Sequence, residues 1–378
     1  MTIYGTRPEA IKMAPLIGAL REHPDLQPTV AVTGQHREML DQVNDLFGIV
    51  PDHDLDLMLH GATLPQLSAR ALLATSELLE ETRPDVVVVQ GDTSSAFVAA
   101  LAAFYQRVPV VHLEAGLRTG DIYSPFPEEV NRRLTAPIAT LHLAPTPTSR
   151  RNLEREGVDP VSITVTGNTV IDALRTALRM PIDFEDGRVG ALVLSGAPFL
   201  LVTSHRRESW GQRMEEAMAA LRDVAQRHPE LQIVLPMHRN AIVREVIEEV
   251  FHGVAQVILT DPLSYHEFAH ALQACRLVVT DSGGVQEEAP SLGKPVLVMR
   301  DTTERPEAVV AGTVKLVGTD REVVREETLR LLEDDEAYQA MANATNPYGD
   351  GQAGVRGAAA IGHLLGLGER LPEFAGGL

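Results

Sequence analysis

Residues 86–113 read VVVVQGDTSSAFVAALAAFYQRVPVVHL. The stretch opens with an apolar run from Val86 to Gln90. It continues through a small-residue turn into a helical pattern from Ser95 to Tyr105, and it ends in a second apolar run, 108–113. Continuous apolar strands separated by a helix are typical of a parallel sheet that helices cover on both faces. These residues therefore predict one strand–helix–strand unit of an α/β domain.

The same alternation continues on both sides of this unit. In the first half of the chain, helical patterns and apolar runs alternate over 11–21, 29–33, 67–82, 141–144 and 163–166. The pattern restarts after Asn168, with strands predicted at 200–203, 233–236, 257–260, 277–280, 296–299 and 314–317. We therefore predict an α/β protein with two doubly wound parallel-sheet (Rossmann-like) domains, residues 1–168 and 169–352, facing across a cleft.

Two segments are predicted to lie outside this alternation. Residues 181–198 contain three glycines and two prolines and are the most loop-like part of the interior, so they are expected to mark a boundary or an insertion. Residues 353–365 are rich in small residues and compatible with a helix. We expect segment 353–378 to complete the first domain, with a frayed tail from Gly366 onward.

Charge and cysteine content exclude several classes of function. The chain has 33 Lys and Arg against 52 Asp and Glu, a net charge of −19, which disfavours binding to nucleic acid or to an anionic membrane surface. The single cysteine, Cys275, excludes a disulfide framework and a thiolate metal cage, so the cytoplasm is the expected location. No apolar run approaches the roughly 20 residues that span a bilayer. An anionic substrate must then be captured by a local cluster of cations and helix N-termini.

Carboxylates follow the predicted strands of the first domain, at the edge where parallel sheets bind ligands. Asp92 and Glu114 each end a strand, and Glu128 and Glu129 follow Pro127 at a predicted helix start. Neighbouring carboxylates in a partly desolvated cleft shift each other's pKa, which suits proton transfer. A buried structural Asp92, or a Glu128 or Glu129 that complements a helix dipole, is an equally open interpretation.

The stretch Thr280–Glu288, TDSGGVQEE, predicts a phosphate cradle in the second domain. A strand leads into a turn in which Ser282 can cap a helix, Gly283 and Gly284 let a diphosphate approach the backbone, and Glu288 can accept hydrogen bonds from a ribose. An ordinary strand-to-helix turn remains an equally open alternative. Neither domain carries Gly-x-Gly-x-x-Gly after its first strand, so a nicotinamide cofactor is not expected.

Residues 266–270, HEFAH, match the helical His-Glu-x-x-His pattern of zinc hydrolases. The motif follows a strand of a doubly wound sheet and does not lie in a zincin scaffold. We therefore interpret it as a chance match and expect no metal.

Several blocks, taken together and in order, resemble the non-hydrolysing UDP-N-acetylglucosamine 2-epimerases over nearly the whole chain. These blocks are residues 5–15, 35–40, 90–93, 112–118, 125–132, 166–169, 205–208, 281–290, 300–307 and 346–351. The resemblance implies a glycosyltransferase-B-like architecture whose last helix crosses back onto the first domain. It also implies cofactor-free interconversion of UDP-GlcNAc and UDP-ManNAc, by elimination of UDP to 2-acetamidoglucal and re-addition after exchange of the C2 proton.

The resemblance assigns roles to residues of this chain. The acid and base candidates are Asp92, Glu114, Glu128 and His205. Arg7 and Lys12 are expected near the diphosphate, with Arg206 among the other substrate-binding residues. UDP is expected on Ser282, Gly283 and Gly284, with Glu288 on the ribose, Arg305 nearby and Phe268 against the uracil.

The family pattern is incomplete at a second site. Many bacterial members are activated by a second UDP-GlcNAc, bound by a Gln-His block, an Arg and a His on a second-domain loop. Gln35, His36 and His238 match, but Gly61 stands where the Arg is expected, so we expect weak or absent substrate activation.

A homodimer is also expected. The alternatives are a hydrolysing epimerase that releases ManNAc, a UDP-sugar glycosyltransferase of the same fold, and a catalytically silent nucleotide-sugar sensor.

Overall fold

A computed structural model describes the chain except residues 35–36, 58–60, 205–209 and 377–378, together with the side chains of residues 37 and 38. The described chain divides into two compact units. Unit 1 comprises residues 1–175 and 348–376, and unit 2 comprises residues 176–347. The chain therefore passes from one unit to the other twice.

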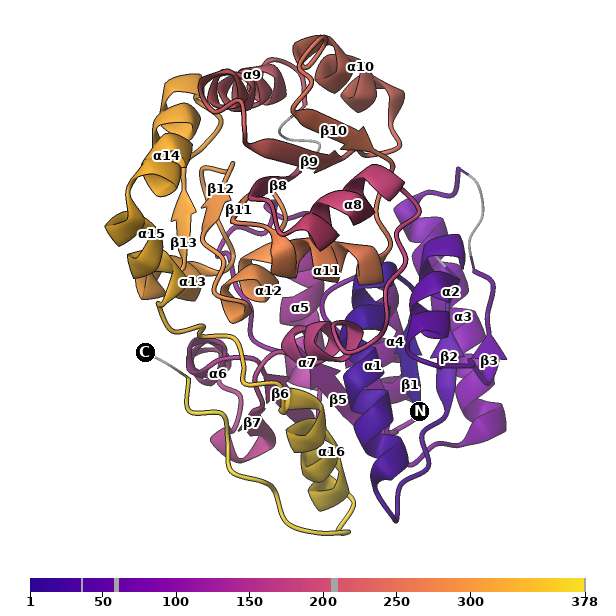
Figure 1. Cartoon of the computed structure of the whole chain (residues 1–378). Helices are drawn as coiled ribbons and strands as arrows, with labels where there is room; N and C mark the ends of the chain where they lie inside the picture. The colour runs from indigo at the N-terminus through magenta and orange to yellow at the C-terminus, as the bar shows by residue number, and fades with distance from the viewer. Residues whose placement is uncertain (35–36, 58–60, 205–209, 377–378) are drawn as a thin grey trace. The chain divides into compact units, whose positions relative to one another are not determined.

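Unit 1 is built on a seven-stranded sheet in the order β3-β2-β1-β4-β5-β6-β7, in which every strand pair is parallel (Figure 1). Its strands are β1 (Thr2–Tyr4), β2 (Val30–Val32), β3 (His53–Asp54), β4 (Val87–Gln90), β5 (Val110–Leu113), β6 (Leu141–Ala144) and β7 (Ile163–Val165). Its helices are α1 (Arg7–Glu22), α2 (Arg37–Leu46), α3 (Leu64–Thr82), α4 (Ser94–Tyr105), α5 (Glu128–Thr135), α6 (Pro147–Arg155), α7 (Thr169–Ala177) and α16 (Ala353–Leu364). α7 begins in unit 1 and ends at the boundary with unit 2.

The valine run that predicted the sheet is buried on both faces of β4. Val87 and Val89 pack in one cluster with Leu79 of α3 and Ala99 of α4. Val88, which points to the opposite face, is also buried. A strand with apolar residues on both sides must be covered by helices on both sides, as the sequence predicts.

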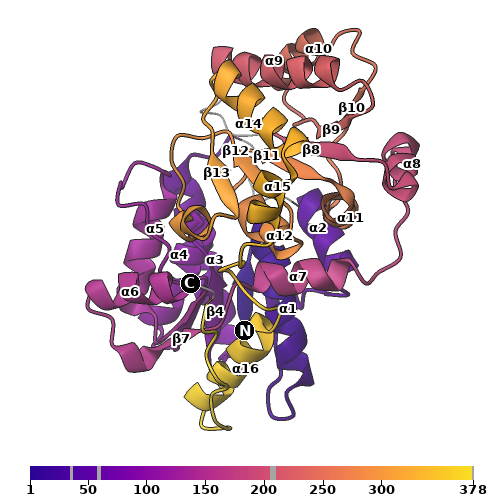
Figure 2. The ribbon, with the colours of Figure 1, turned by 60° about the vertical axis from the view of Figure 1, so that its left-hand side comes forward.

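α16 docks on α1 through small residues (Figure 2). A Cβ added at Gly354 would lie 2.7 Å from the Pro15 carbonyl oxygen, so only glycine permits this approach of the two backbones. The Asp172 carboxylate of α7 accepts a hydrogen bond of 2.9 Å from the Gly354 amide. These contacts fix the last helix to unit 1.

The prediction of a frayed tail after Gly366 is wrong for residues 366–376. The Phe374 amide donates to the Val165 carbonyl (2.8 Å), and the Arg370 guanidinium donates to the Ile163 carbonyl (3.3 Å). Both acceptors belong to β7, the edge strand of the sheet. The tail therefore uses backbone groups of an edge strand that would otherwise be open.

Replacing Asp172 with asparagine is expected to raise the unfolding temperature near pH 8 and to change it little near pH 4. Burial raises the pKa of Asp172 from 3.8 to about 6. The folded state thus favours the protonated carboxyl, and ionisation weakens folding as the pH rises through this window. Asparagine can still accept the Gly354 bond and never ionises. Thermal unfolding of both proteins at both pH values checks this, and an equal shift at the two pH values would contradict it.

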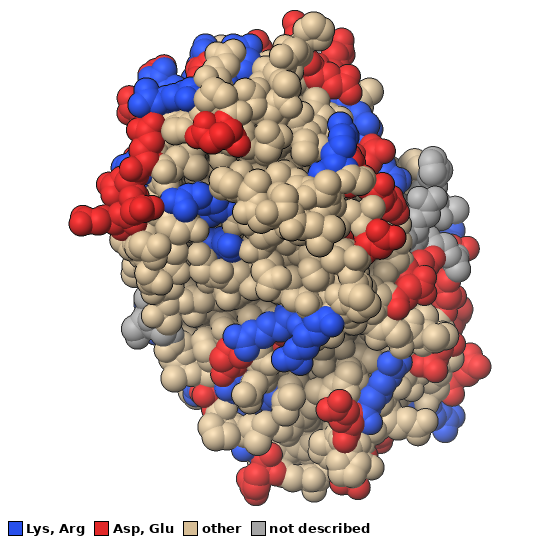
Figure 3. All heavy atoms as spheres, viewed as in Figure 1, with Lys and Arg blue, Asp and Glu red and all other residues tan. Residues whose placement is uncertain are grey.

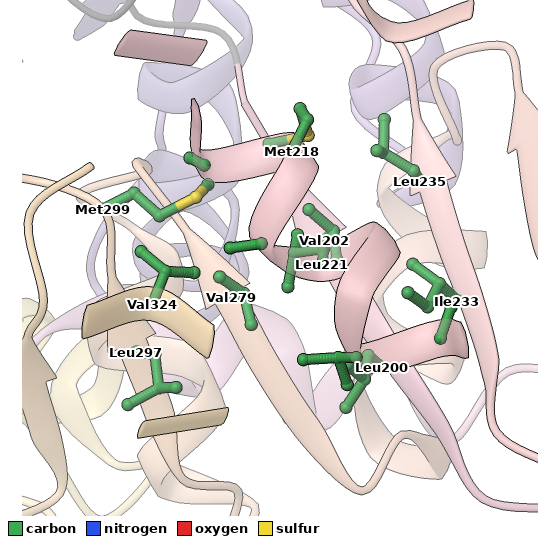
Figure 4. Close-up of a cluster of buried hydrophobic side chains, with 14 of the residues drawn as sticks. Leu200, Val202, Met218, Leu221, Ile233, Leu235, Val279, Leu297, Met299 and Val324 are labelled. Carbon is green, nitrogen blue, oxygen red and sulfur yellow. The ribbon is translucent and has the colours of Figure 1, made fainter. Parts of the chain in front are cut away.

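Unit 2 has a six-stranded parallel sheet in the order β10-β9-β8-β11-β12-β13. Its strands are β8 (Phe199–Thr203), β9 (Gln232–Pro236), β10 (Val257–Thr260), β11 (Leu277–Thr280), β12 (Val296–Val298) and β13 (Val314–Leu316). Its helices are α8 (Gly187–Ser195), α9 (Gln212–Arg227), α10 (Ala241–Val250), α11 (Tyr265–Ala274), α12 (Val285–Ser291), α13 (Pro306–Ala311), α14 (Arg321–Glu333) and α15 (Asp335–Ala342). Leu200 and Val202 of β8 pack with Met218 and Leu221 of α9, and Figure 4 shows this core. The prediction of two doubly wound parallel sheets is confirmed.

The prediction that residues 181–198 are loop-like is wrong in its centre, where α8 lies. Asp186 begins this helix by accepting a hydrogen bond from the Arg188 amide (2.9 Å), and Gly190 packs against the Phe184 side chain.

Among the described residues, no helix is both long and apolar enough to cross a membrane. Figure 3 shows acidic and basic side chains interspersed over the face drawn.

Candidate active site

Glu114 lies directly after β5, at the carboxyl edge of the unit 1 sheet. Its carboxylate forms an ion pair with the Lys12 ammonium and accepts hydrogen bonds from the Gln90 amide (2.6 Å) and the Asn168 amide (3.0 Å). Its backbone is left-handed, with φ 65°, which costs free energy for a residue other than glycine. The surrounding contacts therefore hold a buried carboxylate in a conformation that it would not adopt alone.

Asp92 lies after β4, the strand that pairs with β5. One carboxylate oxygen is 2.5 Å from the Arg132 guanidinium, and the Asn131 amide donates to the Asp92 carbonyl (2.9 Å). The Asp92 side chain keeps 25% of its surface exposed, while that of Arg132 keeps only 5%. Asp92 is thus an accessible carboxylate that rests on a buried cation.

The neighbouring pair Glu128 and Glu129 divides into two roles at the start of α5. Glu129 is fully buried, and its carboxylate accepts hydrogen bonds from the Thr119 and Gly120 amides (3.0 and 3.2 Å) and from the Arg133 guanidinium (3.1 Å). Glu128 is half-buried at the first helical residue. Glu129 is therefore a structural carboxylate at the start of the helix, whereas the Glu128 side chain is accessible to solvent.

Glu9 is a buried carboxylate that the sequence analysis did not single out. It accepts hydrogen bonds from the Gly5 and Thr6 amides (2.9 and 2.7 Å) and from the Thr93 hydroxyl (2.5 Å). The Thr93 hydroxyl also caps α4 by accepting a bond from the Ala96 amide (3.0 Å). Burial raises the pKa of Glu9. Glu9 thus joins the starts of α1 and α4, beside Arg7, a half-buried residue that begins α1.

The glycine turn after β11 differs from the sequence prediction in its cap. Gly284, not Ser282, occupies the N-cap position of α12, and no side chain caps this helix. The Ser282 amide instead donates to the Thr280 hydroxyl (2.9 Å). Because the helix begins only after Gly284, Ser282 lies two residues before the N-cap position and does not cap α12.

Gly283 lies against a buried charge network. Arg305 is paired with Glu287 (2.5 Å) and with Glu304 (2.9 Å). A Cβ added at Gly283 would lie 2.6 Å from the Arg305 guanidinium, whereas one at Gly284 would meet only the Glu288 carboxylate at 3.7 Å. Close packing against Arg305 therefore requires a glycine at the first of the two positions.

α11 supplies the remaining described residues of the predicted nucleotide site. The Tyr265 hydroxyl donates to the Glu288 carboxylate (2.9 Å), and Phe268 is half-buried. Glu267 of the zinc-like motif accepts bonds from Ser264 (2.8 Å) in a capping box and from the Glu185 amide (2.8 Å). In the part of the chain that the structure describes, no group of three or more His, Cys, Asp or Glu could hold a metal ion.

Four predicted residues lie outside the described ones: Gln35, His36, His205 and Arg206. His238 is exposed on the loop after β9. Its ring accepts a hydrogen bond from the Asn240 amide (3.1 Å), and it lies 6.2 Å from the Trp210 ring.

Comparisons with known proteins agree on one family. A family profile described as UDP-N-acetylglucosamine 2-epimerase matches residues 18–362. The UDP-N-acetylglucosamine 2-epimerase of Escherichia coli K12 is 54% identical over 360 residues, which cover 93% of this chain and 95% of that protein. The chain belongs to the UDP-N-acetylglucosamine 2-epimerase family.

Solved structures of this family share the fold. The putative epimerase of Listeria monocytogenes has a TM-score of 0.94 at 46% identity, covering 99% of this chain and 98% of that one. The epimerase of Neisseria meningitidis, described as bound to UDP-GlcNAc, has a TM-score of 0.89 at 44% identity and covers 97% and 99%. The α/β fold with two parallel sheets is thus the glycosyltransferase-B-like fold of this epimerase family.

In this epimerase-family chain, replacing Gly283 with alanine is expected to lower the unfolding temperature. The added methyl group must displace the Arg305 guanidinium, which Glu287 and Glu304 hold in place. Thermal unfolding of the variant and of the unchanged protein measures the effect. Gly284→Ala is the matched control for stability, and an equal loss of stability in both variants would contradict the packing argument.

Proposed function

We propose that this protein interconverts UDP-GlcNAc and UDP-ManNAc without releasing free sugar. The observation that carries the proposal is the constellation around the buried Glu114 carboxylate, with Asp92 on the neighbouring strand end and Glu128 at the start of α5. Membership of the epimerase family and the Neisseria meningitidis structure described with UDP-GlcNAc support the choice of substrate.

The chemistry must remove a proton from C2, which no neighbouring carbonyl activates. In the proposed first step a base takes the C2 proton, a C1–C2 double bond forms and the C1–oxygen bond breaks, so UDP leaves with the bonding electrons. The products are 2-acetamidoglucal and UDP. In the second step UDP adds back to C1 while an acid delivers a proton to the other face of C2. No electron is gained or lost overall, so the proposed sequence requires no redox cofactor.

Such a reaction needs proton donors and acceptors on both faces of C2. We assign these roles to Asp92, Glu114, Glu128 and His205, the acid and base candidates that the resemblance implies, because positioned carboxyl and imidazole groups can take and give protons. Lys12 forms an ion pair with Glu114. We propose that Lys12 and Arg7 also bind the diphosphate of the substrate.

UDP is proposed to bind unit 2. The proposed contacts are the turn of Ser282, Gly283 and Gly284 for the phosphates, with Arg206 and Arg305 as cations. Glu288, oriented by Tyr265, is proposed to bind the ribose, and Phe268 the uracil. A homodimer, a cytoplasmic location and weak or absent activation by a second UDP-GlcNAc stay predictions. A sigmoidal dependence of rate on UDP-GlcNAc would contradict the last.

Proton NMR of the purified protein with UDP-GlcNAc in D₂O tests the proposal. The expected result is UDP-ManNAc with deuterium at C2. UDP together with free ManNAc would instead indicate a hydrolysing epimerase. UDP binding without turnover would refute epimerisation and favour a glycosyltransferase or a silent sensor.

A further inference from the structure

α5 holds the Asp92 loop at two points. The Asn131 amide donates to the Asp92 carbonyl (2.9 Å) and lies 3.3 Å from the Ser94 hydroxyl, while the Arg132 guanidinium lies 2.5 Å from the Asp92 carboxylate. Glu128 is the first residue of the same helix. The two carboxylates therefore come from different segments, but a single helix fixes both.

Arg132 forms ion pairs with two carboxylates, and Asp92 (2.5 Å) is nearer to it than Glu129 (3.4 Å). Within the described part of the chain, its Nε and Nη1 atoms are buried without a hydrogen-bond partner, whereas Nη2 bonds Asp92. Glu129 lies 3.4 Å from Nη1, but its carboxylate is already bonded to the Thr119 and Gly120 amides. Burying a cation is costly unless a nearby anion compensates it, and Asp92 is the closest one recorded.

We infer that Arg132 is a positioning residue that keeps Asp92 ionised and fixed relative to Glu128, so that Asp92 enters the reaction as a base. A guanidinium at hydrogen-bond distance favours the charged form of a carboxyl and restricts its rotamer. The Arg132 side chain keeps 5% of its surface exposed and bonds the Asp92 carboxylate, so we assign it a role that acts through Asp92. The inference rests on the proposed function only in giving Asp92 a role in proton transfer.

Other titratable groups on the packed elements are already engaged. They are Glu9 and Lys12 of α1, His112 of β5, Glu114 after β5, and Glu128, Glu129 and Arg133 of α5. Lys12 pairs with Glu114, and Arg133 bonds Glu129. His112 bonds the Gly91 carbonyl (2.7 Å), and burial lowers its pKa to about 3, so its ring is neutral at working pH. Arg132 contacts the Asp92 carboxylate directly, so its removal should affect Asp92.

The test compares Arg132→Met with Arg133→Met, a matched loss of a guanidinium one residue further along α5. Arg132→Met is expected to lower kcat/KM at neutral pH by about a hundredfold and to move the acidic limb of its pH profile up by about one unit. Arg133, whose side chain is 40% exposed, should leave the limb in place when replaced. Arg132→Lys, which keeps the charge, should restore the limb at least in part. If Arg132→Met does not fold, Arg132→Gln, which also removes the charge but keeps a polar side chain, takes its place.

An acidic limb that stays in place in both Arg132 variants while kcat falls would overturn the inference, as would an equal movement in Arg133→Met. Carbon-13 NMR of the Asp92 carboxyl, assigned with Asp92→Asn, follows its ionisation without turnover. Removal of Arg132 should raise its titration midpoint, and an unchanged midpoint would also overturn the inference. If the wild-type protein does not epimerise UDP-GlcNAc, only the proposed function is refuted. The NMR titration of Asp92 would still test whether Arg132 keeps Asp92 ionised.

Discussion

Replacing Glu114 with glutamine is expected to lower kcat by about a thousandfold, with a much smaller change in KM. The glutamine side chain has nearly the same shape but cannot take or give a proton at working pH. Its amide would also face the Lys12, Gln90 and Asn168 donors, which now converge on a carboxylate. Initial rates of UDP-ManNAc formation, measured over a range of UDP-GlcNAc concentrations, give both constants.

Two controls make this result specific. Glu80→Gln changes an exposed glutamate on α3 and should leave kcat unchanged. Thermal unfolding of Glu114→Gln should remain cooperative, which separates loss of chemistry from loss of fold. A kcat within about tenfold of the wild type would remove Glu114 from the list of acids and bases.

Replacing Gly116 with alanine is expected to destabilise unit 1 by about 3 kcal/mol or more. Gly116 has φ +93°, and an added Cβ would lie 2.8 Å from the Ser149 carbonyl carbon and closer still to its oxygen. A backbone carbonyl within α6 cannot move aside as a flexible side chain can. Urea unfolding followed by circular dichroism measures the loss of stability.

Gly120→Ala separates the two causes of this loss. Gly120 has a similar φ of +85°, but an added Cβ would meet nothing within 4 Å. It should therefore cost only the backbone strain, about 1 kcal/mol. If the two variants lost equal stability, the contact with Ser149 would not be the cause.

Much of the fold could be predicted because strands buried on both faces have a simple signature. β4, β8 and β11 are continuous runs of apolar residues, and this pattern alone was enough to predict them as buried strands. β3, of two residues, is too short and polar to give a pattern. α8 contains two glycines that lower helix propensity, and its start depends on the Asp186 cap and on the Phe184 ring.

The candidate site could be predicted as a set of residues but not as a set of pairs. Carboxylates at strand ends identified Asp92 and Glu114, since chain order brings successive strand ends to one edge. Nothing in the spacing indicated that Arg132, forty residues from Asp92, would bond it. Glu9 and Asn168 lie within the quoted blocks, but only the folded structure shows that Glu9 bonds Thr93 and that Asn168 bonds Glu114.

Unit 1 contains both the first and the last described residues of the chain, and this has a consequence for the order of assembly during synthesis. Unit 2 is continuous, so all of it is synthesised before α16. Until then α1 lacks the helix that packs on it, and Asn168, which bonds Glu114, lacks the Tyr348 carbonyl that its own amide contacts at 2.6 Å. The Glu114 network of unit 1 therefore gains the support of Tyr348 and α16 only after unit 2 has been synthesised.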